Sequence, residues 1–111
     1  MLGELDWPHR VIRIDARLNQ AAARSTLAHE LVHAERGPLP AIPALADLEE
    51  NLVDQETARR LIPLPQLAHA LADSNNPTQA AAILDVDKAT LVTRLTHLHP
   101  AEKAWLRNQH P

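Results

Sequence analysis

The feature that most constrains the fold is the near absence of large aromatic side chains. The sequence has no Phe and no Tyr, and its only tryptophans are Trp7 and Trp105. Apolar residues nevertheless make up 45% of the chain, which is enough for a hydrophobic core and too much for a disordered chain. Leu, Ala, Val and Ile must therefore fill that core, which favours closely packed helices over an aromatic-rich β-sandwich.

Length, charge and cysteine content exclude several classes of protein. The 111 residues are the length of one ordinary domain, so we expect a single domain over residues 1–111. A formal net charge of -3 gives no indication of a nucleic-acid or membrane-surface binder. Because cysteine is absent, nitrogen and oxygen atoms must hold any bound metal. The sequence shows no secretory segment and no apolar run of membrane length, so we expect a cytoplasmic location.

Turn and capping signals predict an N-terminal β-hairpin followed by helices. We expect strands over residues 2–7 and 10–15, because Ile12 and Ile14 alternate with polar residues. A helix is predicted over residues 20–36, with Asn19 as its N-cap and Gly37 just beyond its end. After a stiff proline-rich connection over residues 38–43, further helices are predicted over 47–61, 65–73, 78–84, 88–98 and 100–108. The expected fold class is therefore mostly α with a short N-terminal β-hairpin, an α+β fold.

The stretch His-Glu-Leu-Val-His at residues 29–33 predicts a metal site on the first helix. His29 and His33 are four residues apart, which places both imidazoles on one face of a helix, one turn apart. Two nitrogens in this arrangement can bind one zinc ion at about 2.0–2.1 Å. Glu30 stands beside the first ligand and can reach a water on the ion without binding the ion itself. The alternative interpretation is a helix whose two histidines are simply solvated.

A third ligand is predicted on the second helix. Glu50 and Asp54 are four residues apart on this helix, and they share a face with a mostly apolar stripe: Val53, Thr57, Ala58 and Leu61. If that stripe packs onto the first helix, Glu50 completes a His₂Glu zinc site with an open fourth position. Asp54 would then accept the free N–H of a ligand histidine. Glu49 and Glu56 fall on another face and are weaker candidates, and the alternative for Glu50 and Asp54 is a solvated helix start.

These motifs resemble the ImmA/IrrE family of zinc metallopeptidases. The matching segments are residues 24–33, then Glu50 with residues 58–63, and the resemblance covers roughly residues 3 to 98. It implies a minimal gluzincin-like domain with His29, His33 and Glu50 as zinc ligands and Glu30 as the general base. In that reading residues 1–62 hold the hairpin and the metal-site helices, and residues 63–111 form a helical C-terminal subregion. The resemblance also implies a protein substrate, such as a helix-turn-helix repressor, in a bacterial or phage setting.

The donor that would stabilise the oxyanion stays open at this level, because the chain has no tyrosine. The candidates are His69, His97, His99, Arg60 and Arg94. The second strand could pair with an extended substrate, or it could merely cover the first helix.

Two other functions also stay open. Residues 78–98 have the rhythm of a helix-turn-helix, which suggests DNA binding as an alternative. The charge of this segment argues against DNA binding, because Lys88 and Arg94 are balanced by Asp85 and Asp87. We therefore expect these helices to pack into the core and to form one wall of the substrate groove. The chain could also be a non-catalytic protein-binding module stabilised by zinc, with His69 as the least implausible fourth ligand.

Overall fold

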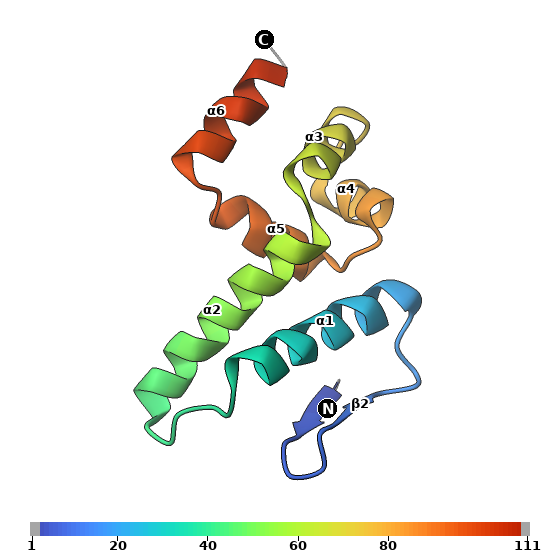
Figure 1. Ribbon diagram of the computed structural model, residues 1–111. Coiled ribbons are helices and arrows are strands. Elements are labelled where there is room, and N and C mark those ends of the chain that lie inside the picture. The colour runs from blue at the N-terminus through green and yellow to red at the C-terminus, as the bar shows by residue number, and fades with distance from the viewer. Residues whose placement is uncertain (1–2, 110–111) are drawn as a thin grey trace.

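The computed structural model describes residues 3–109, and this part of the chain forms an antiparallel hairpin followed by six helices (Figure 1). The elements are β1 (Gly3–Asp6), β2 (Val11–Ile14), α1 (Gln20–Arg36), α2 (Pro43–Leu61), α3 (Leu64–Ala72), α4 (Pro77–Leu84), α5 (Lys88–Thr96) and α6 (Pro100–Gln109). The expected mostly helical α+β class is confirmed. Leu2, which we predicted in the first strand, lies outside the described residues. Over residues 3–109, no helix combines the length and apolar character needed to cross a membrane.

The capping signals give the bounds of α1 correctly. The side chain of Asn19 accepts a hydrogen bond from the backbone N–H of Ala22 at 2.8 Å, and the helix ends at Arg36, as expected. Gly37 follows with a φ of 102°, a conformation that favours glycine. The predicted start of α2 was wrong by four residues, because Pro43 is its first residue and not part of the connection. Proline suits the first turn of a helix, where its fixed φ fits and no N–H is needed.

The hairpin lies directly on α1. Leu5 pairs with Ile12 and Gly3 with Ile14, and both strands contact α1. A Cβ on Gly3 would lie 2.5 Å from the Cγ2 of Thr26, which is closer than two carbon atoms can approach. The missing side chain of Gly3 is therefore what allows β1 to approach the helix that carries the two histidines.

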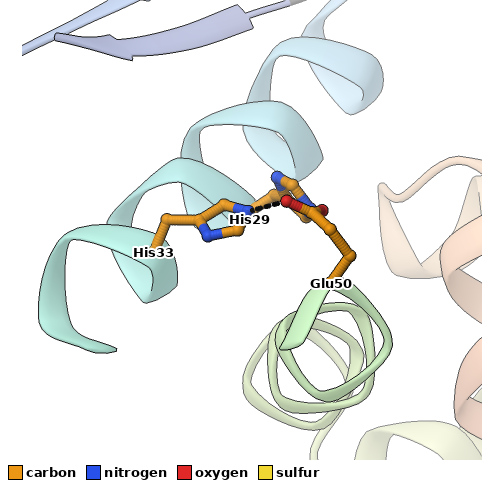
Figure 2. Close-up of side chains that lie close together, drawn as sticks. All are labelled: His29, His33 and Glu50. Carbon is orange, nitrogen blue, oxygen red and sulfur yellow. Dashed lines mark ion pairs between the residues drawn. The ribbon is translucent and has the colours of Figure 1, made fainter. Parts of the chain in front are cut away.

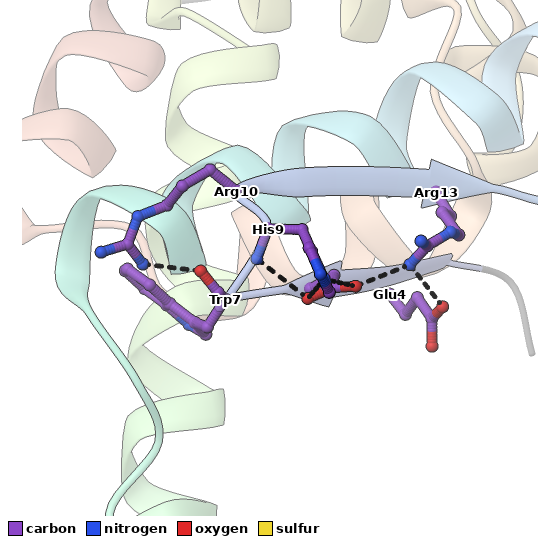
Figure 3. A network of polar contacts seen from close by, with 6 residues as sticks. Glu4, Trp7, His9, Arg10 and Arg13 are labelled. Atoms are coloured by element: carbon purple, nitrogen blue, oxygen red, sulfur yellow. Dashed lines mark hydrogen bonds and ion pairs between the residues drawn. The ribbon is translucent and has the colours of Figure 1, made fainter.

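A network of polar contacts holds the outer face of the hairpin (Figure 3). Asp6 accepts hydrogen bonds from the backbone N–H of His9 at 3.2 Å and contacts its ring at 3.0 Å, and Arg13 contacts both Asp6 and Glu4 at 3.2 Å. The hydrogen bonds from His9, with Arg13 beside them, hold the pKa of Asp6 below its usual value. His9 and Arg13 are exposed, so the network contributes more to the register of the strands than to overall stability.

Two groups of buried residues flank the metal-site face. Val32 of α1 and Val53 of α2 are almost fully buried where these two helices pack together. The second group is larger and joins the C-terminal half of α2 to the following helices: Ile62, Leu67, Ala70, Ala80, Ala81, Val86 and Leu91. Helix α2 contacts both α1 and α5, and Figure 1 shows α5 beside its C-terminal end. Four apolar residues of the helix-turn-helix-like segment, Ala80, Ala81, Val86 and Leu91, belong to this core, whereas Ile83 and Val92 are exposed.

Candidate metal centre

The two histidines of α1 lie on one face of the helix, as their spacing predicted. Their ring centroids are 4.7 Å apart and their planes meet at 81°, so the rings are close to perpendicular. His33 is buried, while the side chain of His29 keeps 27% of its exposure. This arrangement lets the Nε2 atoms of both rings face the same point beside α2.

Glu50 of α2 meets both histidines (Figure 2). Its Oε1 is 2.8 Å from the Nε2 of His33, and its Oε2 is 3.4 Å from the Nε2 of His29. Val53, one turn further along α2, is fully buried, and α2 packs against α1. The three residues thus form a set whose ligand atoms all lie within 4.8 Å of one another.

The chemistry of this set fits a divalent metal ion such as zinc. In each contact a ring nitrogen faces a carboxylate oxygen, and two lone pairs repel unless a proton or a cation lies between them. Ligands of a tetrahedral zinc site at about 2.0–2.1 Å from the ion stand about 3.3 Å apart. The two measured distances from Glu50 to the histidines, 2.8 and 3.4 Å, are close to that spacing. Each histidine therefore has a carboxylate oxygen near the spacing that a shared ion requires.

Asp54 and Glu30 lie on the two sides of His29. The Oδ1 of Asp54 is 3.1 Å from the Nε2 of His29, which is the nitrogen that also faces Glu50. The Nδ1 of His29 instead faces the Oε1 of Glu30 at 3.5 Å. A nitrogen that binds a metal cannot also donate a hydrogen bond, so the role of Asp54 as acceptor of a ligand histidine's free N–H stays a prediction. Glu30 is buried beside the metal set without belonging to it.

Neighbouring carboxylates are occupied elsewhere. Arg36 donates two hydrogen bonds to Glu49, from Nε to Oε1 and from Nη2 to Oε2, the latter at 3.0 Å. This pairing holds the pKa of Glu49 below its usual value. Glu56 accepts a hydrogen bond from Arg60 at 3.0 Å. Both placements agree with their ranking as weaker candidates, because an arginine already neutralises each carboxylate.

The proposed oxyanion donors do not lie at the metal set. Arg94 is buried and donates to the backbone oxygen of Ile62 at 2.8 Å and to Glu102 at 2.6 Å, so it is part of the core. The side chain of His69 is 76% exposed, pairs with Asp73 just after α3, and does not belong to the metal set of the described residues. The remaining three candidates contact groups away from the metal set: Arg60 contacts Glu35, His97 contacts the backbone oxygen of Thr93, and His99 contacts Arg59. The His69–Asp73 and His97–Thr93 pairs follow the i,i+4 spacing of a helix, whereas the partners of Arg60, Arg94 and His99 include residues distant in the sequence.

Two cavities of about 350 Å³ each open beside the centre, and His29 and Glu30 line both of them. We call the first the hydroxyl cavity; its polar walls come from α1, α2 and α5: Ser25, Thr26, Asp54, Thr57, Asp87, Thr90 and Thr93. We call the second the hairpin cavity; it is also lined by Leu5 and Trp7 of the hairpin, by Leu39 of the loop after α1, and by His33 and Glu50 of the metal set. The sequence analysis assigned no function to Ser25 or Thr57, although Ser25 stands one turn before His29 and Thr57 shares the face of Glu50.

The helix that carries His-Glu-x-x-His, the hairpin upon it and the carboxylate from the next helix define a metallopeptidase-like domain. The family model for the IrrE N-terminal-like domain, peptidase M78, matches residues 2–96 of the chain. The chain therefore belongs to this family, as its resemblance to the ImmA/IrrE metallopeptidases predicted. No curated protein and no solved structure matches the chain.

Proposed function

We propose that the chain is a zinc-dependent endopeptidase whose metal is held by His29, His33 and Glu50. The observation that carries this proposal is the meeting of two imidazoles and one carboxylate within 4.8 Å, with a further carboxylate buried beside them. A purely structural zinc site uses four protein ligands, whereas a catalytic one keeps a position open. The three-residue set supports the catalytic reading, and Glu30 is the residue left to act on the substrate.

The proposed reaction is hydrolysis of a peptide bond. When bound, zinc supplies Lewis-acid chemistry, since it lowers the pKa of water and polarises a carbonyl group. Glu30 acts as the general base: it takes one proton from the attacking water and gives it to the leaving amine. A C–O bond forms, the C–N bond breaks, and the products are a carboxylic acid and an amine.

The substrate belongs to the proposal as well. The resemblance to the ImmA/IrrE family favours a regulatory protein, such as a helix-turn-helix repressor, over a general digestive role. Both cavities lie beside the metal set, so an extended peptide can reach Glu30 from either side.

Metal content tests the ligand set first. We expect about one zinc per chain in the reconstituted protein by mass spectrometry, and strongly reduced zinc in His33→Ala and Glu50→Gln. Glu49→Gln is the matched control, because Glu49 is adjacent in sequence but pairs with Arg36, and it should keep its zinc. Full zinc content in Glu50→Gln would remove Glu50 from the set.

Catalysis needs a second experiment. A peptide library treated with the zinc-loaded protein should show new chain ends by mass spectrometry. Glu30→Gln should bind zinc normally and produce none of them, because it lacks the base. If the unmodified protein also cuts nothing in the library or in repressor proteins, the non-catalytic zinc-binding module is the better interpretation.

A further inference from the structure

We infer that a third cavity, separate from the metal centre, binds the C-terminal end of a peptide whose last side chains are apolar. This cavity lies between α1, the end of α2 and the helices α3 and α4, and its volume is about 480 Å³. Ligand pockets typically measure about 300–1,000 Å³. We call it the arginine cavity, because Arg24 and Arg60 line it. No residue of the metal set lines it, so binding there does not depend on a metal.

The arginine cavity is positively charged. Arg24 and Arg60 line it, and no Asp or Glu of residues 3–109 does so, whereas carboxylates line both cavities at the metal centre. The whole chain carries a formal charge of -3, so this excess of positive charge is local. The cavity therefore favours a ligand with a negative charge and disfavours a basic one.

Arg24 has donors available for such a ligand. Its Nη1 donates to the backbone oxygens of Leu84 at 3.1 Å and Asp85 at 2.9 Å, which holds the guanidinium against the end of α4. These oxygens carry no net charge, and no ion pair of residues 3–109 includes Arg24. Its Nε and Nη2 have no hydrogen-bond partner in that part of the chain. A carboxylate can accept hydrogen bonds from two such groups at once.

Arg60 is held in place from the other side. Its Nε donates to Glu56 at 3.0 Å and its Nη2 contacts Glu35 at 2.6 Å, which fixes the plane of the guanidinium. Among the described residues its Nη1 has no hydrogen-bond partner, so this group remains for a ligand. The first turn of α3 adds backbone N–H groups beside it, because Pro63 at the N-cap position provides no side-chain acceptor.

The other walls of the arginine cavity are mostly apolar. They come from the end of α2, the start of α3 and the end of α4: Leu61, Pro63, Pro65, Ile83 and Leu84. Ile83 is 44% exposed, so a ligand can reach its side chain. Gln66 also lines the cavity, and its amide can both donate to and accept from a peptide group.

This combination fits the end of a peptide chain. A ligand must place a carboxylate at the arginines and an apolar group beside it. The last residue of a peptide carries both groups on one Cα, whereas an acidic side chain inside a peptide extends its carboxylate away from the neighbouring side chains. A fatty acid also joins the two groups, but it offers no peptide group to Gln66.

Binding can be measured by calorimetry on the zinc-loaded Glu30→Gln protein, so that no probe is cut. The first probe is acetyl-Ala-Ala-Leu-Leu with a free carboxylate, and the second is the same peptide with a C-terminal amide. The third, acetyl-Leu-Glu-Leu-Ala amide, has its carboxylate on a side chain, and the fourth is decanoate. We expect the free acid to bind about tenfold more tightly than its amide, and the third and fourth probes to bind several-fold more weakly than the free acid.

Two variants test the cavity itself. Arg60→Gln removes one charge, and its control is Arg59→Gln, because Arg59 also pairs with Glu56 but does not line the cavity. Ile83→Glu places a carboxylate on the apolar wall, and its control is Val92→Glu, because Val92 is 46% exposed on α5 and lies outside the cavity. Arg60→Gln and Ile83→Glu should each weaken binding of the free acid several-fold, and the controls should leave it unchanged.

The outcomes decide the inference whether or not the protein proves to be a peptidase. Equal affinity for the acid and its amide would overturn it, and so would unchanged affinity in both Arg60→Gln and Ile83→Glu, the result expected if the carboxylate binds zinc instead. Binding of the third probe or of decanoate as tight as that of the acid would overturn the choice of a peptide end. A preference for the acid that weakens in these two variants but not in their controls would support it.

Discussion

The buried hydroxyl of Thr57 leads to a prediction that runs against the usual effect of changing a residue near an active site. Thr57→Val should stabilise the metal-free, peptide-free protein. The hydroxyl oxygen of Thr57 is buried without a partner in a residue that is 4% exposed. In the unfolded chain the same group binds water, so folding removes its hydrogen bonds and returns none. Valine has a similar shape and places a methyl group at the same position.

The size of the effect follows from that lost hydration. Removing an unsatisfied buried polar group recovers about 1–3 kcal/mol, and we expect a gain of about 1–2 kcal/mol because the wall of a cavity is less confined than a core. Helix propensity does not change the sign, since Thr and Val rank close together. For a chain of this length the gain corresponds to a rise in Tm of about 4–8 °C.

Thermal and urea unfolding followed by circular dichroism can measure this gain, with chelator present to keep the protein free of metal. Thr96→Val is the matched control, because Thr96 is exposed on α5 and its hydroxyl donates to the backbone oxygen of Val92 at 2.7 Å. It should change stability by no more than about 0.5 kcal/mol. A lower Tm for Thr57→Val would refute the reasoning, because it would mean that the hydroxyl has a partner in the folded protein.

Three further predictions concern the core, the acid stability and the metal. Leu91→Ala, at a fully buried position, should lower the free energy of unfolding in urea by about 2–5 kcal/mol. A loss below about 1 kcal/mol would contradict the core described above. The hydrogen bond from Arg94 lowers the pKa of Glu102 from 4.5 to about 2, so the pair stabilises the fold fully above pH 4.5 and this contribution is lost as pH falls toward 2. Glu102→Ala should therefore lower the free energy of unfolding by about 3 kcal/mol at pH 7, which is the lower end for a buried pair because the Glu102 side chain is 18% exposed. At pH 2.5 the loss should be much smaller. An equal loss at the two pH values would argue against the pair. Zinc at about 100 times its Kd should add about 2.7 kcal/mol to the stability, and the same increase in Glu50→Gln would show that the ion binds elsewhere.

The sequence alone determined the features that depend on short-range order. The bounds of α1 follow from Asn19 and Gly37, because caps act within one turn of the helix end. The shared face of His29 and His33 follows from the helical repeat in the same way. Pro43 was misplaced because proline both stiffens a loop and begins a helix, and its neighbours in the sequence do not separate these two roles.

Only the tertiary structure decided which distant residues meet. The packing of α2 against α1 brought Glu50 to the histidines, whereas helical spacing within α2 could only suggest which of its faces turns inward. The approach of α5 to α2 brought Asp87 into the hydroxyl cavity, and Arg94 proved to be part of the core. The physical reason is that capping and periodicity are carried by the backbone within a few residues. Burial, ion pairing and unmet hydrogen bonds depend on which helices pack together.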